Sequence, residues 1–200
     1  MSEATGGVQA PGGDSLRPSI SDDGRYVVFT SGAVDLVPGD TNTCDIWTTP
    51  GSCPDVFLHD RVTHVTELVS VSTGGDQANA NAFSGGAVSE GGRYVFFDVC
   101  ASNLVPDDNN GARDVFVRDR VTATTERVSV ANDGTEGDSH SFLNAITPDG
   151  RHVAFESVAS NLVAGDTNAL GDVFVRDREA GTTERVSLAT GGREAVGGAE

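Results

Sequence analysis

The sequence lacks lysine altogether and has very little tryptophan, methionine, tyrosine and cysteine. All 13 basic residues are therefore arginines, and 30 acidic residues outnumber them, which gives a net charge of −17 at pH 7. A protein of this charge repels nucleic acid and anionic lipid, so we expect neither as a partner. No apolar stretch approaches the roughly 20 residues that cross a bilayer, so we expect no membrane insertion. The first residues of this chain also lack the basic and apolar regions of a signal peptide.

Two of the three cysteines flank a short segment in which we expect the chain to reverse direction. Cys44 and Cys53 enclose Pro50 and Gly51, which are residue types typical of turns. A disulfide between the two cysteines is expected to hold this excursion, and it implies an oxidising compartment. The alternative is a pair of unrelated thiols. The spacing of the cysteines fits no zinc-binding motif.

The main feature of the sequence is a unit that occurs three times. Each unit has a Gly-Arg turn, at Gly24, Gly92 and Gly150, and successive turns are 68 and 58 residues apart. A short apolar segment precedes each turn, and two apolar segments separated by an Asp/Asn loop follow it, before a fourth segment of alternating polarity. We expect first strands at 18–21, 86–89 and 144–147, second strands at 26–29, 94–97 and 152–155, third strands at 55–58, 114–117 and 172–175, and fourth strands at 66–71, 125–130 and 183–188.

Four short strands per unit, with no helical periodicity between them, are typical of a β-propeller blade. The second and third strands are apolar on both faces, as expected of a blade that lies between two others. We therefore predict an all-β fold, a β-propeller segment of three four-stranded antiparallel blades, with residues 1–200 forming a single segment. The blades are predicted at about 8–75, 76–134 and 135–192.

Three blades do not close a ring, because propellers have about four to eight. Two apolar blade faces are then uncovered, and such surfaces favour self-association or another partner. One arrangement is a pair of chains, each of them half of a six-bladed ring, and another is a filament of chains stacked head to tail. A third possibility is that the chain is a fragment of a longer propeller.

Residues 18–29, Pro-Ser-Ile-Ser-Asp-Asp-Gly-Arg-Tyr-Val-Val-Phe, show the repeat in its clearest form. This pattern, with weaker copies at 87–97 and 146–155, resembles the TolB-type, WD-like propeller repeat of bacterial envelope and secreted proteins. Residues 102–106 and 160–164, each leading to Asp-Val-Phe-Val-Arg-Asp-Arg, are similar to a subfamily with Asp-x-Asn-x-x-x-Asp loops. The resemblance implies a secreted or cell-envelope protein of a bacterium. It specifies the fold and not the function, because propellers of this kind serve many roles.

Each unit carries Asp-x-Asn and a further Asp between its second and third strands. The first Asp always falls 16 residues after the glycine of the Gly-Arg turn. Calcium takes about six to eight oxygen ligands, which carboxylates and amide oxygens on a short curved backbone can supply. The predicted calcium ligands are Asp40, Asn42 and Asp55 in the first unit, Asp108, Asn110 and Asp114 in the second, and Asp166, Asn168 and Asp172 in the third. In the first unit the Cys-bounded excursion precedes the last ligand, and Asp45 competes for its role.

The alternative for these loops is an Asx turn, in which Asp and Asn side chains bond backbone N–H groups and no ion is involved. Three copies in one register, each with a second carboxylate, favour calcium, because a divalent cation removes the repulsion between clustered carboxylates.

The sequence contains no Gly-x-Ser-x-Gly elbow, no phosphate-binding loop and no His-Glu-x-x-His motif. We therefore predict a non-enzymatic, calcium-binding β-propeller module that acts in protein binding or self-assembly. One alternative is a fragment of a larger propeller that recognises a ligand. A second alternative is a propeller hydrolase, although no particular carboxylate pair stands out.

Overall fold

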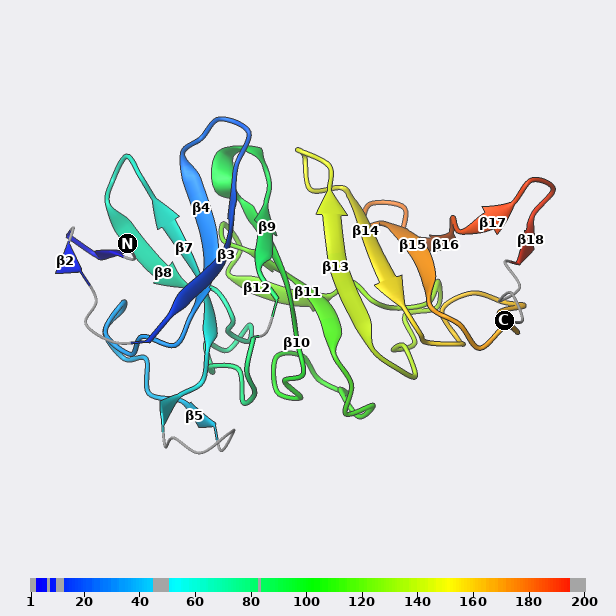
Figure 1. The fold of residues 1–200 in the computed structure, drawn as a ribbon, viewed down its shortest axis with the longest axis horizontal. Coiled ribbons are helices and arrows are strands. Elements are labelled where there is room, and N and C mark those ends of the chain that lie inside the picture. Colours follow the sequence, from blue (N-terminus) through cyan, green and yellow to red (C-terminus); the bar gives the residue numbers. More distant parts are fainter. Residues whose placement is uncertain (1–2, 7, 10–12, 45–50, 83, 195–200) are drawn as a thin grey trace.

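The computed structural model describes residues 3–6, 8–9, 13–44, 51–82 and 84–194 (Figure 1). Apart from η1 (Glu90–Gly92), a single turn of 3₁₀-helix, every regular element in these ranges is a β-strand. Within the same ranges no helix has the length and apolar character that crossing a membrane requires. For the two-residue strands β1, β2, β5 and β6, only the backbone is described.

Three four-stranded antiparallel sheets follow one another along the chain and stand side by side in Figure 1. The first contains β3 (Ser15–Ile20), β4 (Tyr26–Ser31), β7 (Asp55–Asp60) and β8 (Val65–Leu68); the second contains β9 (Gly86–Val88), β10 (Tyr94–Val99), β11 (Asp114–Asp119) and β12 (Thr124–Arg127); the third contains β13 (Ser141–Ile146), β14 (His152–Ser157), β15 (Asp172–Asp177) and β16 (Thr182–Arg185). Strands that are neighbours in a sheet are also successive strands of that unit, which is the topology of a propeller blade. The all-β class and the four-stranded antiparallel sheets are therefore confirmed.

Short hairpins accompany the sheets. β1 (Glu3–Ala4) pairs with β2 (Val8–Gln9), and β17 (Leu188–Ala189) pairs with β18 (Arg193–Glu194). Isolated bridges between Val71 and Gln77 and between Val130 and Glu136 have the same spacing. We call residues 3–9, 71–77, 130–136 and 188–194 the connectors. A further hairpin, β5 (Thr43–Cys44) with β6 (Gly51–Ser52), projects from the first sheet (Figure 1).

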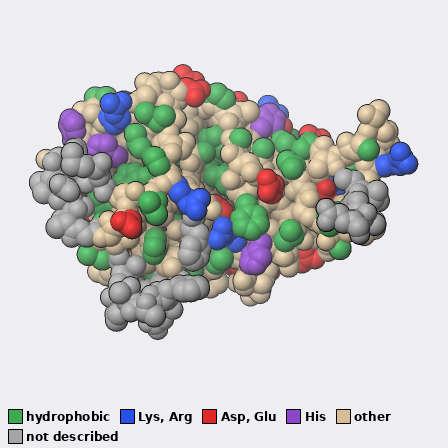
Figure 2. All heavy atoms as spheres, viewed as in Figure 1, with side chains coloured by type: hydrophobic (Ala, Val, Ile, Leu, Met, Phe, Trp, Pro, Cys, Tyr) green, Lys and Arg blue, Asp and Glu red, His purple; other side chains and the backbone are tan. Residues whose placement is uncertain are grey.

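The core lies between the sheets. One cluster combines Val28 and Val56 of the first sheet with Phe97 and Phe116 of the second. A second cluster joins the second and third sheets in the same way, through Val115, Val128, Phe155 and Phe174 among others. Burial of this apolar surface is what holds each sheet to the next. Hydrophobic side chains also reach the surface on the face seen in Figure 2, mainly over the first and second sheets.

The predicted fourth strands are too long at their ends. β8 stops at Leu68, where the sequence predicted pairing as far as Val71. The reason is Ser70, whose hydroxyl accepts the N–H of Val56 (3.0 Å) and so replaces the next backbone bond of the ladder. Ser129 and Ser187 do the same in the other sheets.

The first strands differ from the prediction at their beginnings. β3 starts at Ser15 and β13 at Ser141, each three residues before the predicted strand, and β9 matches its predicted start at Gly86. Register shifts between Leu16 and Ser19 and between Leu143 and Ala145 interrupt the pairing of the two longer strands. Such shifts are β-bulges, which break the regular alternation on which strand prediction depends.

Candidate metal centre

The last predicted ligand of each loop is the first residue of the third strand in its sheet, and it is buried. Asp114 illustrates the arrangement: Ser129 Oγ donates to its Oδ1 (2.6 Å) and Asn110 Nδ2 donates to its Oδ2 (3.0 Å). The equivalent bonds join Asp55 to Ser70 and Asn42 (2.6 and 2.8 Å), and Asp172 to Ser187 and Asn168 (2.5 and 3.1 Å). In all three loops the structure thus brings the predicted Asn and the second Asp together.

An arginine occupies the centre of the third loop. Nη1 of Arg185, the last residue of β16, lies 3.1 Å from Asp166 Oδ1 and 3.3 Å from Asp172 Oδ2. The same nitrogen lies 2.7 Å from Glu194 Oε1. Only 7% of the Arg185 side chain is exposed. One nitrogen among three carboxylates is where a bound cation would be expected, and here the chain supplies that cation itself.

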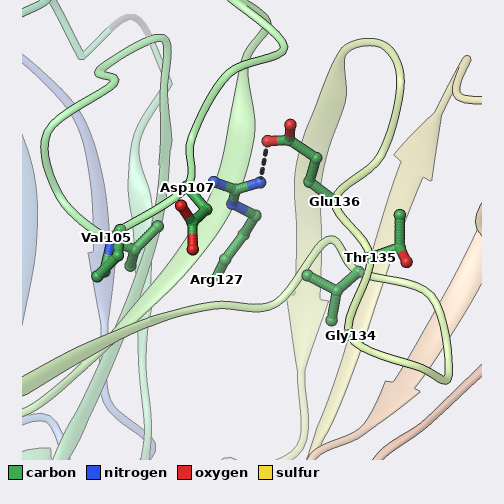
Figure 3. Close-up of a pocket in the computed structure, with 8 residues that line it drawn as sticks. Val105, Asp107, Arg127, Gly134, Thr135 and Glu136 are labelled. Carbon is green, nitrogen blue, oxygen red and sulfur yellow. Dashed lines mark hydrogen bonds and ion pairs between the residues drawn. The ribbon is translucent and has the colours of Figure 1, made fainter.

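The second loop has the same design. Arg127 ends β12, and its guanidinium lies 3.4 Å from Asp108, 3.9 Å from Asp114 and 2.5 Å from Glu136. Figure 3 shows Arg127 pointing between Asp107 and Glu136 and paired with the latter. A hollow of about 470 Å³ opens beside this pair, lined also by Val105 and Gly134.

The first loop has no such arginine. Leu68 opposes Phe57 in the first sheet as Arg127 opposes Phe116 in the second, and Gln77 takes the place of Glu136. Leu68 packs against the apolar cluster around Phe29 and Phe57. Among the described residues, no basic side chain forms an ion pair with Asp40 or Asp55.

Two buried oxygens of the first loop stay without a hydrogen-bond partner within the described part of the chain. They are Asp40 Oδ1 and Asn42 Oδ1. Asp40 is 8% exposed and Asp55 fully buried. Burial raises the pKa of Asp40, and burial together with the nearby charge of Asp40 raises the pKa of Asp55 to about 6. Unpaired buried carboxylates are costly, and a cation at this position would remove that cost.

The Asx turn that was the alternative to calcium is present in the other two loops. Asn110 Oδ1 accepts the N–H of Ala112 (2.7 Å), and Asn168 Oδ1 accepts the N–H of Leu170 (2.9 Å). The amide oxygens of these two residues are therefore already bonded within the chain. In the first loop the Asn42 oxygen has no partner among the described residues.

The donor set of the first loop suits a hard cation, because carboxylate and amide oxygens are the ligands that calcium prefers. Asp40, Asn42 and Asp55 supply three such groups, and calcium would need further oxygens from water or from elsewhere in the chain. The described residues contain no group of three or more His, Cys, Asp or Glu side chains that could hold a metal ion. Asp45, the competing ligand, lies outside the described residues, so its role stays a prediction.

The sequence prediction missed the arginines and the glutamates that complete the second and third loops. The signal was present in the repeats: position 68 and its equivalents read Leu, Arg and Arg, while position 77 and its equivalents read Gln, Glu and Glu. Arginine at the first position is always found with glutamate at the second, and leucine with glutamine. The charged pair is therefore present as a unit in two repeats and absent as a unit from the first.

The predicted disulfide also belongs to the first loop. Pairing of β5 with β6 turns the chain back between the two cysteines, and Cys53 is buried at 1% exposure. The side chain of Cys44 lies outside the described residues, so the Cys44–Cys53 bond stays a prediction.

No protein-family model and no curated protein sequence matches the chain. The solved structures to which it is similar include a putative TolB from Agrobacterium tumefaciens, at 15% identity over 89% of this chain and 50% of that one, with a TM-score of 0.48. They also include the tricorn protease (13% identity, 81% of this chain, 13% of that one, TM-score 0.47) and an oligogalacturonate lyase from Vibrio parahaemolyticus (13%, 84%, 38%, 0.45). The chain spans half or less of each of these proteins. The fold class of this chain rests on its own four-stranded antiparallel sheets.

Proposed function

We propose that the chain is a non-enzymatic β-propeller module that binds calcium through its first Asp-rich loop and acts in protein binding or self-assembly. The observation that carries the proposal is the contrast between the loops. All three bury the side chains of the same pair of aspartates, but among the described residues only the second and third loops place an arginine beside them. The first loop has Leu68 in that place and two buried oxygens without a partner among the described residues.

The position of positive charge, rather than the net charge, supports a divalent cation at the first loop. In the third loop Arg185 lies among three carboxylates, those of Asp166, Asp172 and Glu194. The first loop lacks both the arginine and the glutamate, so its two carboxylates have the same net charge but no positive group between them. A calcium ion would balance these two charges, whereas the hydrophobic Leu68 can balance neither.

The three sheets are proposed to be three blades, equivalent to half of a six-bladed ring, that self-assemble through the faces of the terminal sheets. Location in a bacterial envelope or outside the cell, and the Cys44–Cys53 bond that fits such a compartment, belong to the same proposal. If the chain is instead a piece of a longer propeller, the same faces would contact further blades of that propeller. The proposal assigns no catalytic residue.

A calcium titration by isothermal calorimetry tests the cation site. We expect the wild-type chain to bind one calcium ion. The variant Leu68→Arg/Gln77→Glu gives the first loop the charges of the second, and we expect it to bind none. Leu68→Met is the matched control and should bind as the wild type does, because it keeps an apolar side chain of similar size.

Two other results of the titration would contradict parts of the proposal. Binding of three ions would support the wider prediction from the sequence and would contradict the neutralisation of the second and third loops by their arginines. No binding at millimolar calcium would support the Asx-turn alternative in all three loops.

A further inference from the structure

The contact between the first and second sheets has a polar rim built from four side-chain and backbone groups. The guanidinium of Arg120, just after β11, lies 5.3 Å above the ring of Tyr26 and pairs with Glu67 of β8. Its Nη1 also donates to the carbonyl of Gly92 (2.5 Å). Gly92 lies against the Tyr26 ring so closely that a Cβ there would be 2.6 Å from it.

The same rim occurs between the second and third sheets. Arg178 lies 4.5 Å above the ring of Tyr94, pairs with Glu126 at 3.6 Å and donates to the carbonyl of Gly150 (2.9 Å). A Cβ on Gly150 would lie 2.9 Å from the Tyr94 ring. Each contact therefore takes an aromatic ring and a glutamate from one sheet, and an arginine and a glycine from the sheet that follows it.

The two terminal sheets carry the unmatched halves of this set. Arg61 donates to the carbonyl of Gly24 (2.7 Å), as Arg120 and Arg178 do to their glycines, and a Cβ on Gly24 would meet nothing within 4 Å. At the other end of the row of sheets in Figure 1, His152 stands where the tyrosines stand, with 43% of its side chain exposed. Glu184 is exposed, and its side chain forms no hydrogen bond or ion pair with another described residue.

The apolar part of the contact is also uncovered on the third sheet. Val173 is 36% exposed, while its equivalents Val56 and Val115 are completely buried. Val186 is 46% exposed, while its equivalents Val69 and Val128 are 1% and 2% exposed. These valines lose their exposure in the first two sheets because the next sheet covers them.

We propose that the third sheet of one copy receives the first sheet of a second copy, with Arg61 above the His152 ring and paired with Glu184. The inference rests on the proposed self-assembly and names the surfaces that carry it. The opposite charges of Arg61 and Glu184, and the pose that Arg61 already shares with Arg120 and Arg178, favour a second copy as the occupant. A contact of this kind is head to tail, so two copies form a ring with two such contacts, or many copies form a filament.

Docking also involves the connectors. Thr73 of the second connector exchanges hydrogen bonds with Thr125 on the fourth strand of the next sheet, and Thr5 of the first connector does the same with Thr66. The connector that ends the third sheet contains the same Ala-Thr-Gly-Gly sequence, at 189–192, as residues 4–7. In the docked pair, connector 188–194 of one copy and connector 3–9 of the next would both lie against the fourth strand of the next copy's first sheet. One of the two connectors therefore has to leave this position when the copies dock.

Charge exchange between Arg61 and Glu184 tests the proposal. Arg61→Glu and Glu184→Arg each place like charges at every contact, and we expect each to weaken association about tenfold per contact, hence about a hundredfold for a ring. A mixture of the two variants restores an opposite pair at both contacts of a mixed ring, so association should return on mixing. The double variant should also associate. Arg17→Glu on β3, which changes the net charge as Arg61→Glu does, is the control for that variant and should leave association unchanged.

Sedimentation velocity over a range of concentrations provides the readout. A wild-type chain that associates while the two charge variants associate equally well overturns the docking of the first sheet on the third and leaves self-assembly standing. A wild-type chain that is monomeric throughout overturns both proposals of assembly. His152→Tyr restores the ring found at the other contacts and should tighten association about threefold. If His152→Tyr leaves association unchanged or weaker, Arg61 does not lie above that ring.

Discussion

At the scale of single residues, one position in each repeat determines how the buried aspartates of the Asp-rich loop are neutralised. Arg127 and Arg185 place a guanidinium among carboxylates at 6% and 7% exposure. Leu68 occupies the equivalent position of the first sheet and carries no charge. A buried charge that has lost its partner typically costs several kcal/mol, so this one side chain is the reason why we propose an external cation for the first loop and none for the other two.

Replacing Arg127 by leucine should therefore destabilise the protein. Arg127→Leu leaves Asp108 and Asp114 buried without a cation, and we expect the free energy of unfolding to fall by about 3–5 kcal/mol in the absence of calcium. Arg127→Leu/Glu136→Gln reproduces the first loop, and added calcium should restore part of its loss. Urea denaturation with and without calcium measures both effects. The exposed Arg193→Leu is the control, expected within about 0.5 kcal/mol of the wild type. A loss for Arg127→Leu as small as that of the control would contradict the role of the guanidinium.

A second prediction at this scale concerns pH. Asp98 of β10 is fully buried, and burial raises its pKa to about 6 although Ser84 and Arg113 favour its charged form. The folded state therefore holds the proton more tightly than the unfolded state, whose Asp pKa is about 3.9. The stability that this proton contributes is complete below pH about 4 and is lost as the pH rises to about 6.

Asp98→Asn removes this titration. The free energy of unfolding of the variant, relative to that of the wild type, should rise by roughly 2–3 kcal/mol between pH 4 and pH 6.5, because only the wild type loses stability over this range. Urea denaturation at several pH values checks the trend, and a difference that does not change across this range would show that Asp98 keeps an ordinary pKa.

At the scale of elements, the sequence predicts the strands well where burial on both faces makes them apolar. β4 and β7 begin at the predicted residues, Tyr26 and Asp55. The ends of the outer strands were predicted wrongly, because Ser70 bonds a neighbouring backbone N–H and its identity as serine does not reveal that. The arginine partners of the aspartates were missed because they come from the fourth strand, which the linear Asp-x-Asn motif does not include.

The turns between first and second strands offer a matched pair of substitutions. Gly92 and Gly24 both have a φ of +72°, but a Cβ would meet the Tyr26 ring only at Gly92. At concentrations where the chain is monomeric, Gly24→Ala should lower the free energy of unfolding by about 1 kcal/mol, from backbone strain alone. Gly92→Ala should cost about 1–3 kcal/mol more, because it also pushes the sheets apart. Equal losses in urea denaturation would show that the contact between Gly92 and Tyr26 does not hold the sheets together.

The excursion between β5 and β6 leads to a chemical prediction. We expect a Cys44–Cys53 disulfide, since the paired strands return the chain between these residues. After purification without reductant and treatment with iodoacetamide under denaturing conditions, intact-mass analysis should show one labelled thiol, that of Cys100. Three labelled thiols would mean that the bond is absent.

At the scale of the whole molecule, the repeat in the sequence predicts the four-stranded sheets because each unit has to bury both faces of its middle strands. The contacts between sheets could not be predicted in the same way. Arg120 and Glu67 are 53 residues apart, and only the packing of one sheet on the next shows that they meet. The number of carboxylates around each loop also depends on how distant segments pack, because the side chains of Gln77 and Glu136 reach their loops from the connectors.

The most direct test of the calcium site is the melting temperature with saturating calcium and with excess chelator, for the wild type and for Leu68→Arg/Gln77→Glu. Calcium should raise the melting temperature of the wild type by several degrees, since an ion that binds only the folded state stabilises it. We expect no such shift for the variant, whose first loop carries its own cation. A wild-type melting temperature that is the same in calcium and in chelator would contradict the calcium site.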